Sequence, residues 1–168
     1  DEWIGQEMIV RTGSLLLDVA STDLANNVFD VNTLELDRPY FSIENFDGLR
    51  PEKPKKKTAA VDTGMYFNAG DLALKIASVK ITEGSFASML RGIKPDPGFF
   101  EGQHIRVSRI NGTLNQVSFI KDTIRAKVEL SAKERSGFEL KKLKADYRLT
   151  PRVMEFANID IRTAKSRL

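Results

Sequence analysis

The sequence predicts a mainly β fold, in which a curved, mostly antiparallel sheet forms an open groove or taco-like half-barrel with little helix. Two observations lead to this prediction. Two segments alternate apolar and polar residues with the period of two that half-buried strands show. A second apolar pattern, with one extra residue at its centre, recurs along the chain. From typical strand and loop lengths we expect roughly six to ten strands.

The alternation is clearest in residues 123–130 and 142–149. Polar residues such as Lys127 separate the apolar ones, so each segment is expected to turn one face to the protein interior and the other to water. The apolar members are Ile124, Ala126, Val128 and Leu130 in the first segment, and Leu143, Ala145, Tyr147 and Leu149 in the second.

The recurring pattern has the form h-x-h-x-x-h-x-h, where h is apolar. At about 100° per residue these positions point in nearly opposite directions around a helix, so no helical face forms. In a strand, a β-bulge at the centre keeps both halves on one face and bends the strand, and repeated bulges curve a sheet. The copies are Phe29, Val31, Leu34 and Leu36; Leu74, Ile76, Val79 and Ile81; Phe138, Leu140, Leu143 and Ala145; Met154, Phe156, Ile159 and Ile161; and the shortened Ile105, Val107 and Ile110.

Turn-forming residues follow several of these copies, at 38–39, 83–84 and 111–112. Glycine adopts positive φ easily and proline cannot donate to a central ladder, so we expect these positions to end strands or to begin hairpins. Residues 134–137 are a further expected hairpin connection. Residues 21–27 fit either one capped helical turn or a loop.

The length of 168 residues fits one β domain, 1–168, or a portion of a longer groove protein. Residues 48–62 are rich in Lys and Pro and predict a mobile insertion loop. Residues 94–98 form a second break. The net charge is +3, but residues 50–57 alone hold five cations and one anion, so the rest of the chain sums to −1. A nucleic-acid partner is therefore not expected.

The polar residues predict no reaction. The chain has no cysteine and one histidine, His104, which would need a nucleophile and an orienting acid to act as a base. The carboxylates are scattered beside Lys and Arg, as on a solvated sheet face. We therefore expect no catalytic residue, no metal and no cofactor. An enzyme with a polar cleft around His104 remains a third hypothesis.

The shared apolar face must be buried against a helix, a second sheet or a ligand. No long amphipathic helix is visible to cover it. The sheet therefore either folds over itself as a closed sandwich or forms an open trough. For a trough, an acyl chain is the natural occupant, but periodicity alone fits both arrangements.

Four segments carry a resemblance to a known family: 32–43, 77–86, 100–112 and 133–143. They resemble the N-terminal repeats of AsmA/TamB-like envelope proteins, in the large version found in Bacteroides-type Gram-negative bacteria. The similarity extends over most of the chain from about Gly13 onward.

The resemblance implies a long curved β groove with an apolar lining that crosses the periplasm, in a parent protein anchored in the inner membrane by one N-terminal helix. It also implies a role in phospholipid movement toward the outer membrane and in the assembly of outer-membrane proteins, which are possible partners. The family is not one of enzymes, so no catalytic residue is carried over. This chain shows neither the anchor nor most of that length.

The residue patterns and the family resemblance together predict a non-enzymatic, periplasmic segment that conducts phospholipid along an apolar groove. The alternative is a β-sandwich interaction module of the cell envelope that binds a protein by its strand edges. The residues expected to line the groove and contact acyl chains are Ile43, Val79, Ile81, Val128, Leu130, Leu143 and Tyr147.

Overall fold

The computed structural model describes residues 2–3, 5–48, 68–94 and 99–167. These residues contain nine strands and no helix, as the sequence predicted. The predicted insertion at 48–62 lies, apart from Gly48, outside the described residues, and so does most of the break at 94–98. The strands are β1 (Gln6–Arg11), β2 (Ser14–Asp23), β3 (Val28–Asp37), β4 (Tyr40–Asn45), β5 (Ala73–Leu90), β6 (His104–Ile120), β7 (Thr123–Glu134), β8 (Glu139–Leu149) and β9 (Met154–Thr163).

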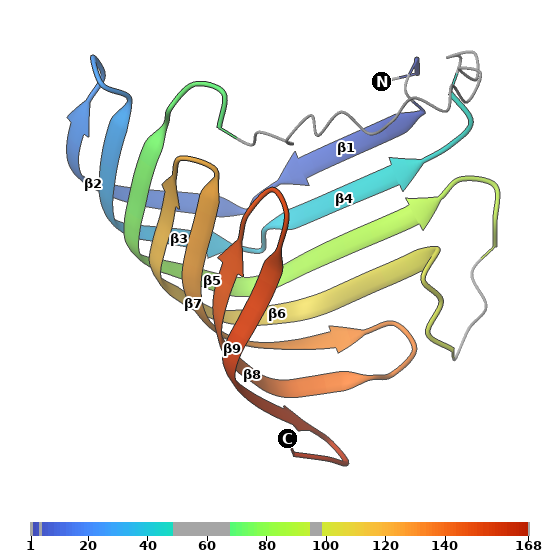
Figure 1. Cartoon of the computed structure of the whole chain (residues 1–168). Coiled ribbons are helices and arrows are strands. Elements are labelled where there is room, and N and C mark those ends of the chain that lie inside the picture. The colour runs from blue at the N-terminus through green and yellow to red at the C-terminus, as the bar shows by residue number, and fades with distance from the viewer. Residues whose placement is uncertain (1, 4, 49–67, 95–98, 168) are drawn as a thin grey trace.

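All nine strands hydrogen-bond into one mixed sheet (Figure 1). The long strand β5 pairs in parallel with β3 along its first half and with β4 along its second half. Every other pairing is antiparallel, from β2 with β3 and β1 with β4 through the meander β5 to β9. The prediction of a curved, mostly antiparallel and open sheet is confirmed. The described residues form one sheet and not two packed sheets, so the sandwich architecture is wrong.

The sheet is bent across its strands into two arms that rise on either side of a hollow (Figure 1). We call the larger one the wide arm. It contains β2, β3, residues 73–82 of β5, residues 111–120 of β6, and most of β7, β8 and β9. The short arm contains β1, β4, residues 84–90 of β5 and residues 104–110 of β6. The face inside the bend is the inner face and the opposite one is the outer face.

Bulges produce the bending, as the recurring apolar pattern predicted. Arg109 has a φ of 52° between Val107 and Ile110, and Asn158 has a φ of 52° between Phe156 and Ile159. Extra residues shift the register of β6 against β5, of β8 against β7, and of β9 against β8 near these positions. Val31 and Leu34, on either side of the centre of one copy, pack on one side of the sheet, because they share a core cluster with their partners Ile76 and Val79 on β5.

The bulges fall on two lines across the sheet. One line lies between the arms, at Arg38 between β3 and β4, at Glu83 in β5 and at Arg109 in β6. The other lies within the wide arm, at Gln116 in β6 and Asn158 in β9. Two bend lines curve the sheet more than one does, and the result is a trough.

Two turn positions predicted as strand ends are wrong. Glu83-Gly84 lies inside β5 and Asn111-Gly112 lies inside β6; only Arg38-Pro39 separates two strands. The physical reason is that the chain bends at these sites without reversing. Asn111 accepts a hydrogen bond from the Glu83 amide (2.9 Å) and donates one to the Glu83 carboxylate (2.8 Å), which holds the bulge closed. The connection at 134–137 is a hairpin as expected, and 24–27 is a loop.

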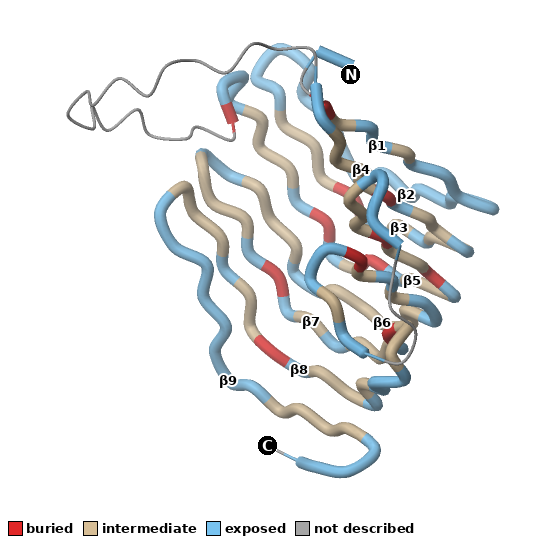
Figure 2. Tube along the Cα trace, turned by 90° about the vertical axis from the view of Figure 1, so that its right-hand side faces the viewer, coloured by how far each residue is buried: buried red, intermediate tan, exposed pale blue. Residues whose placement is uncertain are grey.

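The core is small because the molecule has one layer. Val31, Ile76 and Val79 are buried at its centre, and the partly buried hydrophobics Leu34, Leu74, Ile81, Leu114 and Val117 pack against them. Figure 2 shows buried segments lying across neighbouring strands, while the first six residues of β9 stay exposed. Curvature alone covers these side chains, since the described residues supply no second layer.

Candidate functional site

The inner face of the wide arm carries four apolar rows that run across the strands. Residues paired directly in neighbouring strands lie on one face, so the register defines each row. The one exception is the step from Val117 to Ala126, which crosses the register shift at Gln116. Edge strand β2 extends three of them through Leu15, Leu17 and Val19. The rows are Phe29, Leu74, Phe119, Ile124, Leu149 and Met154; Val31, Ile76, Val117, Ala126, Tyr147 and Phe156; Leu34, Val79, Leu114, Val128 and Ala145; and Leu36, Ile81, Gly112, Leu130, Leu143 and Ile161.

The structure places all seven predicted groove residues on the inner face of the sheet, six in the wide arm and one in the short arm. Six belong to rows of the wide arm: Val79 and Val128 to the third row, Tyr147 to the second, and Ile81, Leu130 and Leu143 to the fourth. Ile43 lies in the short arm, paired with Met8 and Ser88. Val79 is buried, and the other six are half-buried.

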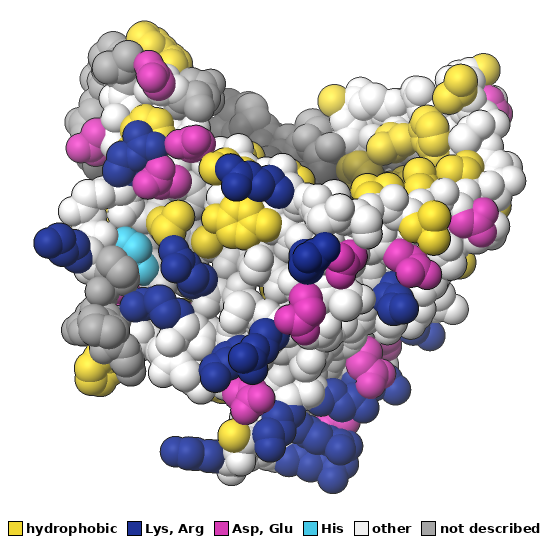
Figure 3. Space-filling model, turned by 180° about the vertical axis from the view of Figure 1, so that it is seen from behind, with side chains coloured by type: hydrophobic (Ala, Val, Ile, Leu, Met, Phe, Trp, Pro, Cys, Tyr) yellow, Lys and Arg dark blue, Asp and Glu magenta, His cyan; other side chains and the backbone are white. Residues whose placement is uncertain are grey.

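The outer face of the wide arm is polar. Lys127, next to Val128, pairs with Asp146 and Asn115 on this face. One outer row reads Glu35, Lys80, Thr113, Glu129, Lys144 and Asp160. Figure 3 shows Lys, Arg, Asp and Glu spread over the outer surface, and hydrophobic side chains on the inner wall of the wide arm above the hollow. The two faces therefore differ sharply in polarity.

The rows set the size of the apolar trough. Seven strands contribute to the wide arm, so at about 4.8 Å between strands the trough is about 29 Å long. Its axis runs across the strands and not along them. Half of a bilayer's hydrocarbon core is about 15 Å thick, which is the length of one acyl chain. The trough therefore accommodates extended acyl chains lying across the strands.

Aromatic pairs lie on the inner face of both arms. Tyr147 packs against Phe156 in the wide arm with ring centroids 5.2 Å apart, and Phe41 packs against Phe86 in the short arm at 5.9 Å. Such tilted pairs stabilise a sheet beyond the area that they bury. Phe41 and Phe156 are still exposed, so both rings offer apolar surface to a ligand.

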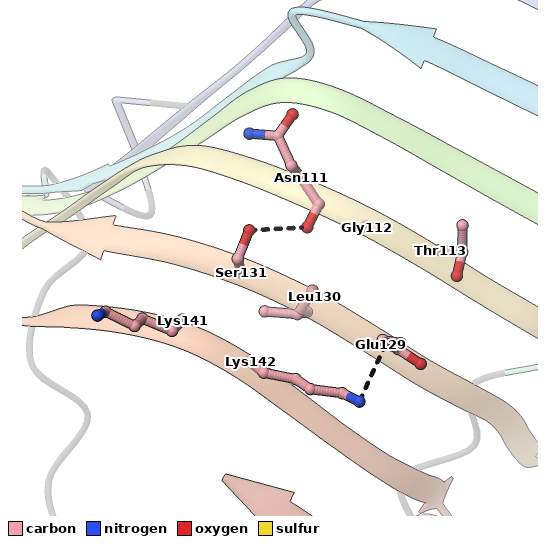
Figure 4. A pocket seen from close by; sticks show the side chains of 8 residues that line it. All are labelled: Asn111, Gly112, Thr113, Glu129, Leu130, Ser131, Lys141 and Lys142. Atoms are coloured by element: carbon pink, nitrogen blue, oxygen red, sulfur yellow. Dashed lines mark hydrogen bonds and ion pairs between the residues drawn. The ribbon is translucent and has the colours of Figure 1, made fainter. Parts of the chain in front are cut away.

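Small clefts lined mainly by polar residues lie along the first bend line. One of about 420 Å³ is lined by Asn111, Gly112, Thr113, Glu129, Leu130, Ser131, Lys141 and Lys142. Figure 4 shows Lys142 reaching toward Glu129, at 3.3 Å, and the Ser131 hydroxyl against the Asn111 carbonyl oxygen. These contacts tie β6, β7 and β8 together where the ladder is interrupted. The cleft lies where bulges shift the register of β6, β7 and β8.

His104 begins β6 on the outer face, where it pairs with Met89. It is buried, with 6% of its surface exposed, and its Nδ1 lies 3.6 Å from a carboxylate oxygen of Glu101. Glu101 supplies the nearby carboxylate that the enzyme hypothesis calls for, while the buried ring offers little surface to a substrate.

No cluster suited to a metal appears either: the described residues hold no group of three or more His, Asp or Glu side chains that could bind an ion.

Sequence reasoning missed part of the inner face. Leu15, Leu17 and Val19 of β2 are exposed there, at 55%, 48% and 43%. The run Leu15-Leu16-Leu17 hides its alternation because Leu16 faces outward and is apolar as well. Leu114, Val117 and Phe119 were missed because a bulge at Gln116 interrupts their spacing. The h-x-x-h signal was present in Leu114 and Val117 and would have found them.

No protein-family profile, no curated protein and no solved structure matches this chain. None of the described residues forms a helix that could cross a bilayer. The function must therefore be argued from the trough itself.

Proposed function

We propose that the inner face of the wide arm is a lipid-binding groove, and that the chain is a non-enzymatic periplasmic segment of an AsmA/TamB-like protein that conducts phospholipid in outer-membrane biogenesis. The observation that carries this proposal is the set of four apolar rows across seven strands with no described element covering them. Acyl chains supply the missing cover.

Energetics support an acyl occupant. Each CH₂ group removed from water contributes about 0.8 kcal/mol, so about six methylenes laid on the rows contribute about 5 kcal/mol. The contact is non-directional, so a chain can shift along the rows from one strand to the next without breaking hydrogen bonds. A surface of this kind binds lipid and still allows it to move. The head group stays at the open side, in water.

The resemblance to AsmA/TamB-like proteins supplies the rest of the proposal, namely the periplasmic location, the inner-membrane anchor of the parent protein and the direction toward the outer membrane. The trough axis across the strands is consistent with that role, because further strands added at either edge would lengthen the path.

The test uses two neighbouring positions on opposite faces. Leu130→Asn places a polar side chain on the inner face, and Glu129→Asn changes the outer face by the same new side chain. We expect Leu130→Asn to weaken phospholipid binding about tenfold, equivalent to about 1.4 kcal/mol of lost apolar contact, and Glu129→Asn to leave it unchanged. Phospholipid retained per chain, measured by mass spectrometry after purification, gives the readout. Equal retention by both variants would refute the groove.

A second candidate function is protein binding by strand addition, with an outer-membrane assembly protein as the partner. One observation favours it: all ten residues of the edge strand β2 are exposed. An open edge is a template for pairing with another strand. Leu16→Lys, on the outer face of β2 and away from the rows, would blunt this edge. Loss of a crosslinked protein partner in that variant, with phospholipid retention unchanged, would favour strand addition.

A further inference from the structure

Three exposed phenylalanines gather where the strands of the short arm end. Phe99 and Phe100 precede β6 and Phe138 lies in the turn between β7 and β8; their exposed fractions are 69%, 65% and 53%. All three line one cleft of about 480 Å³ together with Thr163, Ala164 and Lys165 from the C-terminal end of β9 and beyond. Large apolar side chains clustered on a surface mark a place of interaction.

A basic cluster adjoins this aromatic cleft. A second cleft shares Thr163 and Lys165 with it. Its cations are Lys141, Lys142, Arg162, Lys165 and Arg167. Figure 3 shows Lys and Arg crowded at the lower edge of the outer surface.

The acidic groups near this cluster do not neutralise it. Asp160 is shared by Arg162 (3.2 Å), Lys142 (3.9 Å) and Arg167 (4.0 Å), and Glu129 pairs with Lys142 (3.3 Å). With Glu139, which lines the aromatic cleft beside Lys165, five cations face three carboxylates, an excess of two positive charges. Among the described residues, no carboxylate lies within ion-pair distance of the ammonium groups of Lys141 or Lys165.

We propose that this rim, formed by Phe99, Phe100, Phe138, Lys141 and Lys165, is a membrane-contact surface that inserts its rings into the interfacial layer of an anionic bilayer. Apolar side chains that enter the acyl boundary beside cations that bind lipid phosphates are the combination that holds proteins at membrane surfaces. A single-stranded nucleic acid would instead require aromatic and basic groups interleaved along one groove. Here they occupy two adjoining clefts.

The inference extends the proposed function without requiring it. The rim would bring the end of the short arm against a bilayer, the source from which lipid reaches the trough. A chain whose trough holds no lipid would still bind vesicles by this rim. Failure of the groove proposal and failure of the rim proposal are therefore distinguishable.

The experiment compares two variants, one with a single tryptophan in the proposed rim and one with a single tryptophan in the β2–β3 turn. In a Trp3→Phe background, Phe138→Trp reports on the proposed rim, and Leu24→Trp reports on the β2–β3 turn, where Leu24 is 74% exposed in the wide arm. The probes are vesicles of phosphatidylcholine alone or mixed with phosphatidylglycerol, each with brominated acyl chains. We expect a blue shift and quenching at position 138 with the mixed vesicles only, and neither effect at position 24.

Charge reversal provides the second measurement. At about fivefold for each cation near an anionic surface, Lys141→Glu with Lys165→Glu should weaken sedimentation with the mixed vesicles at least tenfold. The matched control, Lys75→Glu with Lys80→Glu on the outer face of β5, should not change it. Equal quenching at positions 138 and 24, no quenching at either, or equal loss in both charge variants would overturn the proposal.

Discussion

The two arms of the sheet share strands β5 and β6 but bury different groups. The wide arm buries Val31, Ile76 and Val79 on its inner face, beneath no other layer. The short arm buries Ser42 and Ala87, which pair with each other on its outer face. The buried residues of these strands thus lie on the inner face on one side of the line of bulges and on the outer face on the other side. The apolar lining belongs mainly to the wide arm, and the short arm forms the opposite wall of the trough.

The largest effect is expected at the bend between the arms. A Cβ at Gly112 would overlap the carbonyl oxygen of Glu129 and lie 2.6 Å from the Cα of Leu130, so β6 and β7 could not keep their pairing. We expect Gly112→Ala to lower the free energy of unfolding by about 3 kcal/mol, as overpacking does. Urea denaturation measures it. Gly70→Ala, whose Cβ would meet no atom within 4 Å, is the control. Equal stability of both variants would mean that β6 does not approach β7 closely at Gly112.

An intermediate effect on stability is expected from truncating one apolar residue in each arm, which compares the two arms directly. Val79 is 7% exposed in the core of the wide arm, whereas Ile43 is half-buried in the short arm. We expect Val79→Ala to lower the free energy of unfolding by about 2 kcal/mol, and Ile43→Ala by about 1 kcal/mol although it removes more atoms. The same denaturation measurement applies. A larger loss at Ile43 would reverse the assignment of the core to the wide arm.

The smallest effect concerns a charged network in the short arm. Arg91 binds Glu44 (2.6 Å) and Glu7 (3.0 Å), and its guanidinium lies 4.0 Å from the centre of the Phe46 ring. The hydrogen bond from Arg91 holds the pKa of Glu44 below its ordinary value of 4.5.

A carboxylate with a lowered folded-state pKa stabilises the fold above its unfolded-state pKa and loses that contribution as the pH falls through the folded-state value. Arg91→Met should therefore lower the melting temperature slightly at neutral pH, and the difference from the unchanged protein should shrink below pH 4.5. Thermal melts at several pH values measure it. A difference that grows on acidification would contradict the ion pair.

Much of the fold was predictable because period-two patterning is local. Residues 123–130 and 142–149 alternate without interruption, and both became strands with the predicted faces. Bulges were predictable from the h-x-x-h spacing. Whether the chain reverses or only bends at each bulge was not predictable. Gly84 and Gly112 fit both a reversal and a bend, and the pairing with the neighbouring strand decides between the two. The parallel pairing of β3 and β4 with β5 was also not predictable, since it depends on contacts far apart in sequence.

The candidate site was partly predictable for a similar reason. Alternation located Val128, Leu130 and Leu143 on one face, but it could not show whether a second layer covers them. The aromatic and basic rim escaped the sequence entirely. Phe99 and Phe138 lie in two separate connections and Lys165 follows β9, and only the meander brings them into one cleft.

Site-specific photo-crosslinking in cells, with the full-length protein, tests the central claim most directly. One probe replaces Val128 on the inner face of the wide arm and the other replaces its neighbour Lys127 on the outer face. The account predicts phospholipid adducts at position 128 and none at position 127. Equal lipid labelling at both positions, or protein adducts at position 127 alone, would contradict a lipid groove.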